Sequence, residues 1–370
     1  MAVPLLDLKA QHATIRDDVV SAMMAVVDAQ TFILGEPVAE LEGAVAALSQ
    51  SRHAVGCANG TDALLLALRA LDVGAGDEVV TTPFTFFATA GAIHNVGGRP
   101  VFVDIDPRTF NIEPQAIAAA MTSKTKAVVA VDLFGQMAAM EHVAKAAGNV
   151  PVIEDAAQTI GASRVIDGKR VMAGEGAAIG TFSFFPSKNL GGYGDGGMMV
   201  CQDDALFETL MKLRTHGSRR TYYHDIVGYN SRLDTLQAAV LLAKLPHLQG
   251  WSAKRRENAA FYDAAFAGLD GITTPFVEAA NTSIYNQYTI RTPRRDELQA
   301  HLKGLGIGHS VYYPMPLHLQ TCFAYLGYRE GQCPESERAA KEVLSLPIYP
   351  ELTRGQLDEV VSAVRSFFGR

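Results

Sequence analysis

The feature that most constrains the fold is an alternation of short apolar runs with helical patterns, which begins near residue 54. The expected strands are 53–58, 78–82, 100–104, 126–133 and 151–155, with helical patterns near 61–72, 86–95, 113–121 and 137–147. Several runs, such as VVAVDLF and VPVIEDA, are apolar almost throughout, which is typical of strands buried on both faces. The sequence therefore predicts an α/β fold in which helices cover both faces of a mostly parallel sheet.

The pattern becomes less regular in the second half of the chain. Two strand-like runs, 179–185 and 197–201, flank the glycine-rich segment NLGGYGDGG. An apolar helix, LDTLQAAVLLAKL, follows a polar loop, and a helix rich in charges begins beyond Pro246. Because 370 residues exceed the usual size of one core, we expect two domains. The large domain covers 1–250, with an N-terminal arm over 1–30, and a smaller α+β domain covers 251–370.

Composition excludes several classes of protein. The formal net charge of −7 argues against extended contact with nucleic acid, which requires clustered Lys and Arg. The four cysteines form no C-x-x-C pair and the histidines no H-E-x-x-H pattern, so no metal site is expected. We find neither a signal-peptide pattern nor a run of about 18 apolar residues, and we expect a cytoplasmic protein without a membrane contact.

Ligands of open α/β sheets bind at the carboxyl ends of the strands, and the motif NGTD follows the first expected strand. Gly60 and Thr61 would lie at the start of the next helix, where free amides and the positive end of the helix dipole bind anions. Helix capping is the alternative interpretation, because Asn and Thr are common N-cap residues.

A second motif, EDAAQ, ends the strand expected over 151–155. An acidic residue such as Asp155 costs solvation free energy there unless it meets a cation or hydrogen-bond donors. A protonated pyridine nitrogen is such a cation, and Gln158 could donate a hydrogen bond to a phenolic oxygen on the same ring. A solvent-facing turn carboxylate is the alternative for this motif.

A third motif, SFFPSKN, places Lys188 after a strand and before the glycine-rich segment. Burial would lower the pKa of this lysine and make it a nucleophile toward an aldehyde, whereas surface charge is the alternative. Ser183, five residues upstream, could offer its hydroxyl to a phosphate. The glycines match G-x-G-x-x-G, but the strand-like MMVCQ follows them where a dinucleotide site requires a helix, so we reject a nicotinamide site.

Taken together, NGTDAL, TPFTFFATA, EDAAQ, SFFPSKNLGGYGDGG and GYNSRLDTLQAA resemble the nucleotide-sugar aminotransferases. These are pyridoxal-phosphate (PLP) enzymes of fold type I, the aspartate-aminotransferase-like fold. The resemblance continues through YYPMPLHLQ and SLPIYP and spans nearly the whole chain. It implies an enzyme that moves an amino group from L-glutamate to a keto group of a nucleotide-linked sugar.

The resemblance also implies roles for residues that contact the cofactor ring. Lys188 corresponds to the Schiff-base lysine, and Asp155 to the partner of the pyridinium nitrogen. Gln158 corresponds to the donor to the phenolic oxygen, and Phe86 to the aromatic residue stacked on the ring.

Other residues correspond to the phosphate site of the family. Gly60, Thr61 and Ser183 match the phosphate cup within one subunit. Asn230 matches a phosphate ligand that comes from the neighbouring subunit, so the resemblance implies a homodimer with shared active sites.

The sequence is most similar to the branch that aminates C3 of a UDP-linked 2-acetamido-3-keto-hexuronic acid for bacterial surface polysaccharide, such as O-antigen. DIDPRTFNI, HGSRRTYYH and SIYNQYTIR carry this similarity. Three residues depart from the family pattern: Tyr312 replaces a His beside the sugar, Ile160 replaces a His or aromatic residue, and Asn189 replaces a Pro. The first departure leaves the sugar, and C3 or C4 amination, open.

Three residues are candidates for contact with the sugar. Arg232 would enter the neighbouring site beside Asn230 and bind a carboxylate or phosphate, with a structural pair to Asp234 or another nearby acid as the alternative. Tyr312 and His318 flank YPMP, a proline-stiffened turn that could present both side chains to the substrate.

Two rival functions remain. A PLP-dependent sugar dehydratase is an offshoot of the family that replaces the Schiff-base lysine with His, whereas Lys188 is intact. A PLP- or sugar-binding regulator without turnover would need an attached DNA-binding module, for which length and charge leave no room.

Overall fold

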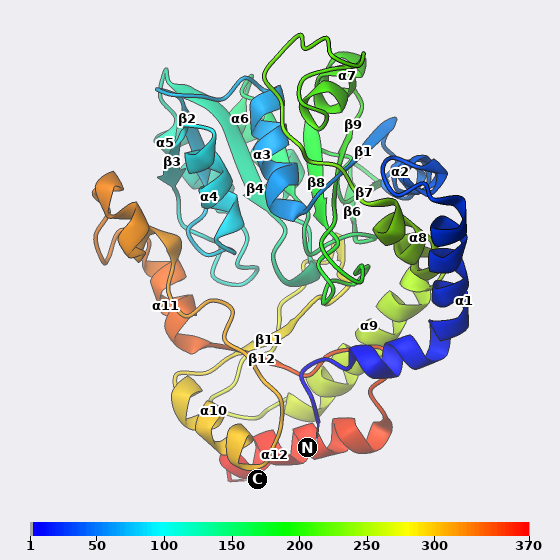
Figure 1. Ribbon diagram of the computed structural model, residues 1–370. Coiled ribbons are helices and arrows are strands. Elements are labelled where there is room, and N and C mark those ends of the chain that lie inside the picture. Colours follow the sequence, from blue (N-terminus) through cyan, green and yellow to red (C-terminus); the bar gives the residue numbers. More distant parts are fainter. Residues whose placement is uncertain (1–2, 370) are drawn as a thin grey trace.

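The computed structural model describes residues 3–369, so the ends of the expected N-terminal arm and C-terminal domain, residues 1–2 and 370, lie outside the described residues. Its centre is a seven-stranded sheet in the order β1-β9-β8-β5-β4-β2-β3. All neighbours pair in parallel except β9, which is antiparallel to both β1 and β8. The predicted α/β fold with a mostly parallel sheet is therefore confirmed (Figure 1).

The strands of this sheet lie close to the expected positions. They are β1 (His53–Cys57), β2 (Glu78–Thr81), β3 (Arg99–Phe102), β4 (Thr125–Val131), β5 (Val152–Asp155), β8 (Ile179–Ser183) and β9 (Gly197–Cys201). Two small sheets complete the β-structure. One contains β6 (Ser163–Ile166), β7 (Lys169–Met172) and β10 (Asn281–Thr282), and the other contains β11 (Tyr288–Arg291) and β12 (Val343–Leu346).

Helices cover both faces of the central sheet because successive strand residues point to opposite sides. Val79 of β2 packs beneath α3 (Gly60–Ala70), α4 (Ala88–Asn95) and α7 (Asp204–Leu213). The next residue, Val80, packs with the opposite layer. That layer contains α5 (Pro114–Ala120) and α6 (Met140–Ala147), continued by α2 (Glu36–Leu48) and α8 (Thr235–Lys244).

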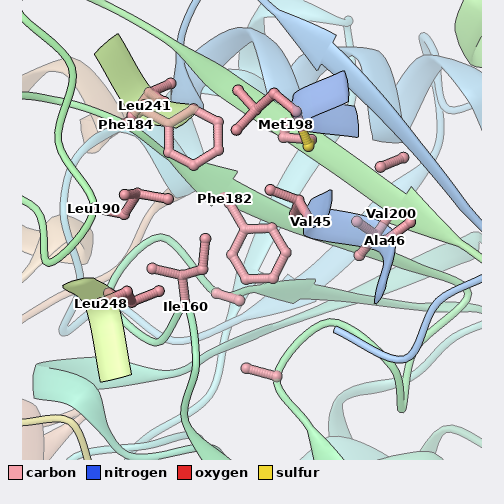
Figure 2. Close-up of a cluster of buried hydrophobic side chains, with 14 of the residues drawn as sticks. Val45, Ala46, Ile160, Phe182, Phe184, Leu190, Met198, Val200, Leu241 and Leu248 are labelled. Carbon is pink, nitrogen blue, oxygen red and sulfur yellow. The ribbon is translucent and has the colours of Figure 1, made fainter. Parts of the chain in front are cut away.

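Figure 2 shows the cluster between the sheet and helices α2 and α8. Phe182 and Phe184 project from the end of β8 and meet Met198 of β9 and Leu241 of α8, all within this buried cluster. The long helix α1 (Leu8–Ala29) packs outside α8 through Ile15 and Val19. This packing fixes the end of β8, where the segment that carries Lys188 begins.

The C-terminal part of the chain has a separate hydrophobic cluster. It is built from α9 (Leu248–Phe266), α10 (Arg295–Gly304), α12 (Arg354–Phe367) and the β11-β12 pair. Helix α9 runs through the expected boundary, since Leu248 packs with the sheet and Tyr262 with the C-terminal cluster. Val3 also joins the C-terminal cluster. The division into 1–250 and 251–370 therefore stays a prediction, with α9 continuous across it.

One C-terminal segment returns to the central sheet. It contains short 3-10 turns at Leu317–Leu319 and Thr321–Leu326, followed by α11 (Pro334–Glu342). Phe323 packs against Phe102 at the end of β3. Figure 1 shows this orange segment beside α4 and β3. It therefore encloses the carboxyl edge of the sheet from the C-terminal side.

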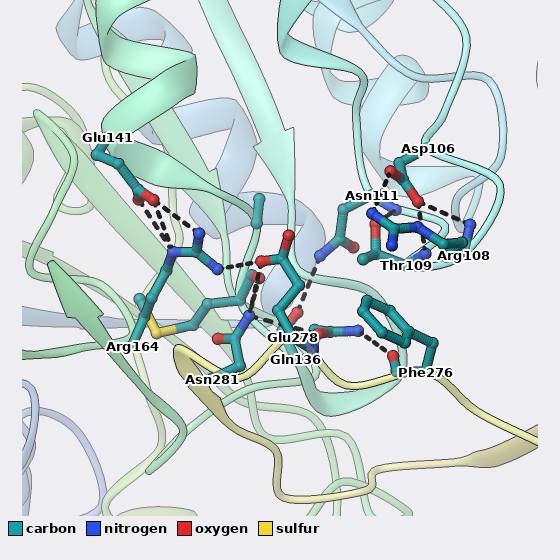
Figure 3. A network of polar contacts seen from close by, with 12 residues as sticks. Asp106, Arg108, Thr109, Asn111, Gln136, Glu141, Arg164, Phe276, Glu278 and Asn281 are labelled. Atoms are coloured by element: carbon teal, nitrogen blue, oxygen red, sulfur yellow. Dashed lines mark hydrogen bonds and ion pairs between the residues drawn. The ribbon is translucent and has the colours of Figure 1, made fainter.

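Figure 3 shows a polar network that fixes a loop at the same edge. The loop follows β4 and includes Gln136, whose amide donates to Phe276 O at 2.9 Å and accepts from Glu278 N at 3.0 Å. Arg164 bridges Glu141 and Glu278. Arg164 is buried and holds Glu278 in place, and Gln136 binds the backbone of the same segment. The network therefore ties the loop after β4 to the distant segment at Phe276 and Glu278.

We expect Phe182→Ala to lower the free energy of unfolding by about 3–5 kcal/mol, because the change removes a buried ring and leaves a cavity. Urea denaturation without added ligand measures the effect. Val165→Ala is the control, since Val165 is 51% exposed and its truncation should change stability by less than about 0.5 kcal/mol. Equal losses in the two variants would contradict the packing described for β8.

Candidate active site

A cavity of about 590 Å³ lies at the carboxyl edge of the central sheet. The ends of β4, β5 and β8 contribute Val131, Asp155 and Ser183 to its wall. Residues named from the sequence that line it are Gly60, Thr61, Phe86, Asp155, Gln158, Ser183, Lys188 and Tyr312. The structure therefore brings together three motifs that are up to 128 positions apart in the chain, as Gly60 and Lys188 show.

Lys188 is the cationic side chain that lines this cavity. Desolvation lowers its pKa to about 8, although the nearby charge of Asp155 acts in the opposite direction. No hydrogen-bond acceptor or ion-pair partner holds its Nζ among residues 3–369. A lysine in this environment is partly uncharged near neutral pH, which makes its Nζ available as a nucleophile.

Asp155 lies at the end of β5 and is almost fully buried. Its Oδ2 accepts a hydrogen bond from Thr89 Oγ1 at 2.8 Å, and its Oδ1 accepts one from Ala157 N at 3.3 Å. Desolvation raises the pKa of Asp155, while Thr89 and the charge of Lys188 oppose that rise. A buried carboxylate without a bonded cation fits a protonated ring nitrogen, because such a nitrogen would compensate its charge.

A hydrogen bond fixes the direction in which the side-chain amide of Gln158 points. Its Oε1 accepts a hydrogen bond from Phe134 N at 2.7 Å. The Nε2 therefore remains as the donor on the other side, where it lies 3.3 Å from Tyr313 Oη. This orientation fits a cofactor that presents an oxygen acceptor to the cavity.

The start of α3 forms a narrow polar cradle. Asn59 caps the helix, since its Oδ1 accepts from Asp62 N at 2.8 Å, so the capping interpretation of NGTD is confirmed. A Cβ on Gly60 would lie 2.6 Å from Ser183 Cβ, and only glycine permits this approach of the helix to β8. The cradle combines helix-start amides with two hydroxyls, which fits a phosphate group.

Phe86 contributes the largest exposed apolar surface named for this cavity. The residue is 59% exposed, and its ring centroid lies 6.4 Å from that of Tyr313. An exposed aromatic face on a cavity wall can stack on a planar ring. Together with Lys188, Asp155 and the cradle at Gly60, Phe86 makes the donor set of this cavity fit pyridoxal phosphate.

Asn230 and Arg232 line an adjacent cavity of about 470 Å³. This second cavity shares Asn59 and Asp195 with the first. Among the ion pairs within residues 3–369, none involves Arg232, so the expected alternative of a pair with Asp234 is not found. A single chain does not test the role of either residue in a neighbouring subunit, and that role stays a prediction.

The prediction that His318 contacts the sugar is wrong. Its side chain is completely buried, and its Nε2 lies 3.0 Å from Glu337 Oε1. Glu337 lies in the first turn of α11 and also accepts hydrogen bonds from the backbone amides of Gly331 and Cys333. The segment presents Tyr312 and Tyr313 to the cavity, whereas His318, beyond the prolines, is buried where Glu337 binds its imidazole.

Two residues that bind predicted site residues were not expected from the sequence. Thr89 holds Asp155, and Tyr313 lies beside Gln158. Thr89 is three residues beyond Phe86, so the spacing within TPFTFFATA is the signal that could have indicated it. The two other departures from the family pattern are buried: Ile160 packs in the core, and Asn189 bonds to Asn286 and to Ile284 O.

Residues 3–369 include no helix that is long and apolar enough to cross a membrane. The same part of the chain holds no group of three or more His, Cys, Asp or Glu side chains that could bind a metal ion.

A family model described as the DegT/DnrJ/EryC1/StrS aminotransferase family matches residues 13–365. The chain is 52% identical to a Geobacillus stearothermophilus protein named "pleiotropic regulatory protein", over 100% of this chain and 99% of the relative. It is 45% identical to the UDP-N-acetyl-3-dehydro-alpha-D-glucosamine 3-aminotransferase of Acidithiobacillus ferrooxidans, over 98% and 97%. It is 43% identical to the UDP-2-acetamido-2-deoxy-3-oxo-D-glucuronate aminotransferase of Pseudomonas aeruginosa, over 98% and 99%.

Solved structures give the same likeness. S. venezuelae DesV superposes with a TM-score of 0.96 at 40% identity, covering 100% of this chain and 99% of that one. NtdA from Bacillus subtilis, solved with bound pyridoxamine phosphate, superposes with a TM-score of 0.89 at 29% identity, covering 99% and 83%. The predicted fold of a PLP-dependent transferase is therefore confirmed.

We expect borohydride to fix PLP to Lys188 as a stable secondary amine, because this side chain faces the cavity and has a lowered pKa. Peptide mass mapping locates the adduct. Lys188→Ala should abolish the adduct while the circular dichroism of the protein stays unchanged.

Lys244 is the matched control for this labelling. Burial lowers its pKa to about 8 as well, but its Nζ donates to Gly191 O at 2.7 Å and it does not line the cavity. An adduct on Lys244 would show that a low pKa rather than the cavity selects the site. An adduct on any lysine other than Lys188 would contradict the assignment.

Proposed function

The chain belongs to the DegT/DnrJ/EryC1/StrS aminotransferase family and is a PLP-dependent enzyme, and we propose that it aminates a keto group of a UDP-linked sugar with L-glutamate as donor. The favoured acceptor is a 2-acetamido-3-keto-hexuronic acid, aminated at C3. The observation that carries the proposal is the meeting of Lys188, Asp155 and Gln158 in one cavity at the carboxyl edge of the sheet.

PLP, when bound, supplies an aldehyde that reacts with amines and a ring that withdraws electrons from the reacting carbon. We assign each protein group a separate task. Lys188 Nζ would hold the aldehyde carbon of the cofactor and would move a proton to or from the reacting carbon. Asp155 keeps the ring nitrogen protonated, and Gln158 Nε2 donates to the phenolic oxygen. The cradle at Gly60, Thr61 and Ser183 binds the phosphate and fixes the position of the ring.

Two relatives support the choice of sugar. The Acidithiobacillus and Pseudomonas proteins are both named for amination of a UDP-linked 3-keto sugar, and both align along nearly the whole chain. An acceptor of this kind could reach the cavity beside Tyr312. A 4-keto sugar is the alternative acceptor, because Tyr312 replaces the His that the family resemblance leads us to expect there.

The name of the Geobacillus relative favours a second candidate, a regulatory role. A regulator that only binds a ligand needs neither a lysine with a lowered pKa nor a buried carboxylate beside it. Loss of the cofactor's absorption band on addition of glutamate, and its return with a keto sugar, would support catalysis. Binding of both compounds without a spectral change would support regulation. The intact Lys188 also argues against the dehydratase.

A homodimer is part of the proposal. Ile33, which lines the same cavity as Asn230, is 50% exposed, and Val227, three residues before Asn230 in the chain, is 86% exposed. Exposed apolar residues of this kind are typical of subunit interfaces.

We place the enzyme in the cytoplasm, where nucleotide-linked sugars and reduced cysteines are expected, and its product in surface polysaccharide such as O-antigen.

Arg232→Lys should slow turnover of a UDP-linked 3-keto-hexuronic acid more than that of the corresponding 6-hydroxymethyl sugar. The planar guanidinium binds a carboxylate through two parallel hydrogen bonds, and their loss should cost about 1–3 kcal/mol for the acid. Values of kcat/KM for both sugars measure the effect. Equal losses would mean that Arg232 does not contact C6, and faster turnover of a 4-keto sugar would reject C3 amination.

Mixing the Asn230→Ala and Lys188→Ala variants should restore part of the activity that each lacks. If Asn230 completes the partner's site, a hybrid dimer contains one site with both native residues. Refolded mixtures with verified hybrid dimers provide the assay, and each variant refolded alone is the control. Hybrid dimers as inactive as the single variants would contradict the shared site.

A further inference from the structure

Two buried carboxyl groups lie directly behind the proposed cofactor site. Asp132 follows β4, and Glu154 is the neighbour of Asp155 on β5. Both are completely inaccessible to solvent, and Ala130, two residues before Asp132, lies opposite Glu154 on the neighbouring strand. The two carboxyl groups therefore share one face of the sheet and lie close enough to share a hydrogen bond. Successive strand residues point to opposite faces, so Glu154 faces away from the cavity that Asp155 lines.

The hydrogen bonds of the two groups are unequal. Asp132 accepts with both oxygens: Oδ1 from Ala138 N at 2.7 Å and Oδ2 from Thr159 Oγ1 at 2.9 Å. Glu154 accepts only with Oε2, from Gly174 N at 3.0 Å. Its Oε1 is buried and has no partner that could donate a hydrogen to it.

Two ionised carboxylates accept hydrogen bonds and donate none, so they can bond to each other only when one carries a proton. Neither group forms an ion pair with a Lys, Arg or His among residues 3–369. Two buried negative charges in contact would therefore be uncompensated, at a large desolvation cost. A proton on the oxygen without a donor, Glu154 Oε1, removes one charge and completes the hydrogen bonding of the pair.

We propose that Asp132 and Glu154 share one proton, carried by Glu154, and that this carboxyl pair positions the residues that contact the cofactor. The pair then has a single negative charge, located on the carboxylate with two other donors. The assignment concerns the cofactor end of the site and does not depend on which sugar is the acceptor.

The electrostatics of the surrounding groups agree with this assignment. Burial, followed by the charge of Asp132, raises the pKa of Glu154 well above its usual value. Burial raises the pKa of Asp132 to about 6, and its hydrogen bonds with Glu154, Ala138 N and Thr159 oppose that rise. The other titratable groups that act on the pair are Asp155 and Glu175, and both are acidic. Because two donors bind Asp132 while Glu154 Oε1 has none, Glu154 is the protonated member near neutral pH.

The pair reaches the cofactor site through two backbone segments. Asp132 binds Ala138 N, which ends the loop whose Phe134 N holds the Oε1 of Gln158. It also binds Thr159, the residue next to Gln158. The network in Figure 3 holds the same loop from the C-terminal side through Gln136. The direction of the Gln158 amide thus depends on an ionised Asp132.

The pair also influences the charge of Asp155. The backbone N–H of Asp132 donates to Asp155 O at 3.1 Å, so the two acids are direct neighbours. A second negative charge on Glu154 would make ionisation of Asp155 harder, because like charges disfavour each other. A neutral Glu154 therefore helps Asp155 to stay ionised opposite a protonated ring nitrogen.

Glu154→Gln and Asp132→Asn test which group holds the proton. The Gln amide can still donate to Asp132 and accept from Gly174 N, so we expect this variant to retain PLP as the wild type does. Asn at 132 offers one acceptor oxygen for two donors, and we expect PLP to dissociate about tenfold faster, as for the loss of one good hydrogen bond. Tolerance of Asp132→Asn with failure of Glu154→Gln would reverse the assignment and overturn the proposal.

The pH dependence of stability gives a second readout, on protein without cofactor. A carboxyl whose pKa is raised by folding stabilises the folded state at low pH, and this stability is lost as pH rises from the unfolded value toward the folded one. Within that window, each pH unit should change the unfolding equilibrium constant of the wild type tenfold relative to Glu154→Gln. Urea midpoints between about pH 5 and pH 8 that keep a constant difference would contradict the shared proton.

Infrared spectroscopy detects the proton directly and does not require Asp132→Asn to fold. A protonated carboxyl has a C=O stretch that a carboxylate lacks. We expect the wild type at neutral pH to show this band and Glu154→Gln to lose it. Glu175→Gln, which replaces a partly exposed acid near Gly174, should keep the band. Its absence from the wild type, or its persistence in Glu154→Gln, would overturn the proposal.

Discussion

The active site depends on a carboxylate that is buried at the end of a strand. Burial of the ionised Asp155 side chain without compensation would cost several kcal/mol of free energy. Thr89 and Ala157 donate hydrogen bonds to it, and Lys188 supplies a positive charge nearby. The enclosure that raises the pKa of the acid also lowers that of the lysine, to about 8. One desolvated cavity thus makes the acid fit a cationic ring and makes the amine a nucleophile.

The parallel sheet explains why residues from distant segments meet in this cavity. The carboxyl ends of β4, β5 and β8 lie side by side at one edge, and each strand is held by apolar side chains on both faces. The chain reverses after β8, and β9 runs back antiparallel to it. The segment that joins these two strands carries Lys188 and keeps it near Asp155. The absence of a side chain on Gly60 lets α3 approach Ser183. The elements proposed to contact the ring and the phosphate of PLP are therefore fixed in position by core packing.

The position of a candidate site residue could be predicted from the sequence where the residue follows a buried strand. Asp155 and Lys188 follow long apolar runs, so their positions at the sheet edge could be expected from local patterns. His318 could not be placed in this way, because Glu337, which buries it, lies on a helix that shares no local pattern with it. The domain boundary was equally difficult, since α9 is one helix that packs in two clusters.

The two halves of the cavity differ in how they are built, and this difference bears on substrate choice. The cofactor half consists of strand ends, a helix start and the turns that follow the strands, whereas Tyr312, Asn286 and Gln287 come from C-terminal loops. Loops tolerate substitution better than strands because fewer buried contacts constrain them. Family members that share the cofactor chemistry can therefore differ in the sugar that they accept. The replacement of His by Tyr312 lies in that variable half, so it can alter the acceptor while Lys188 and Asp155 keep the same chemistry.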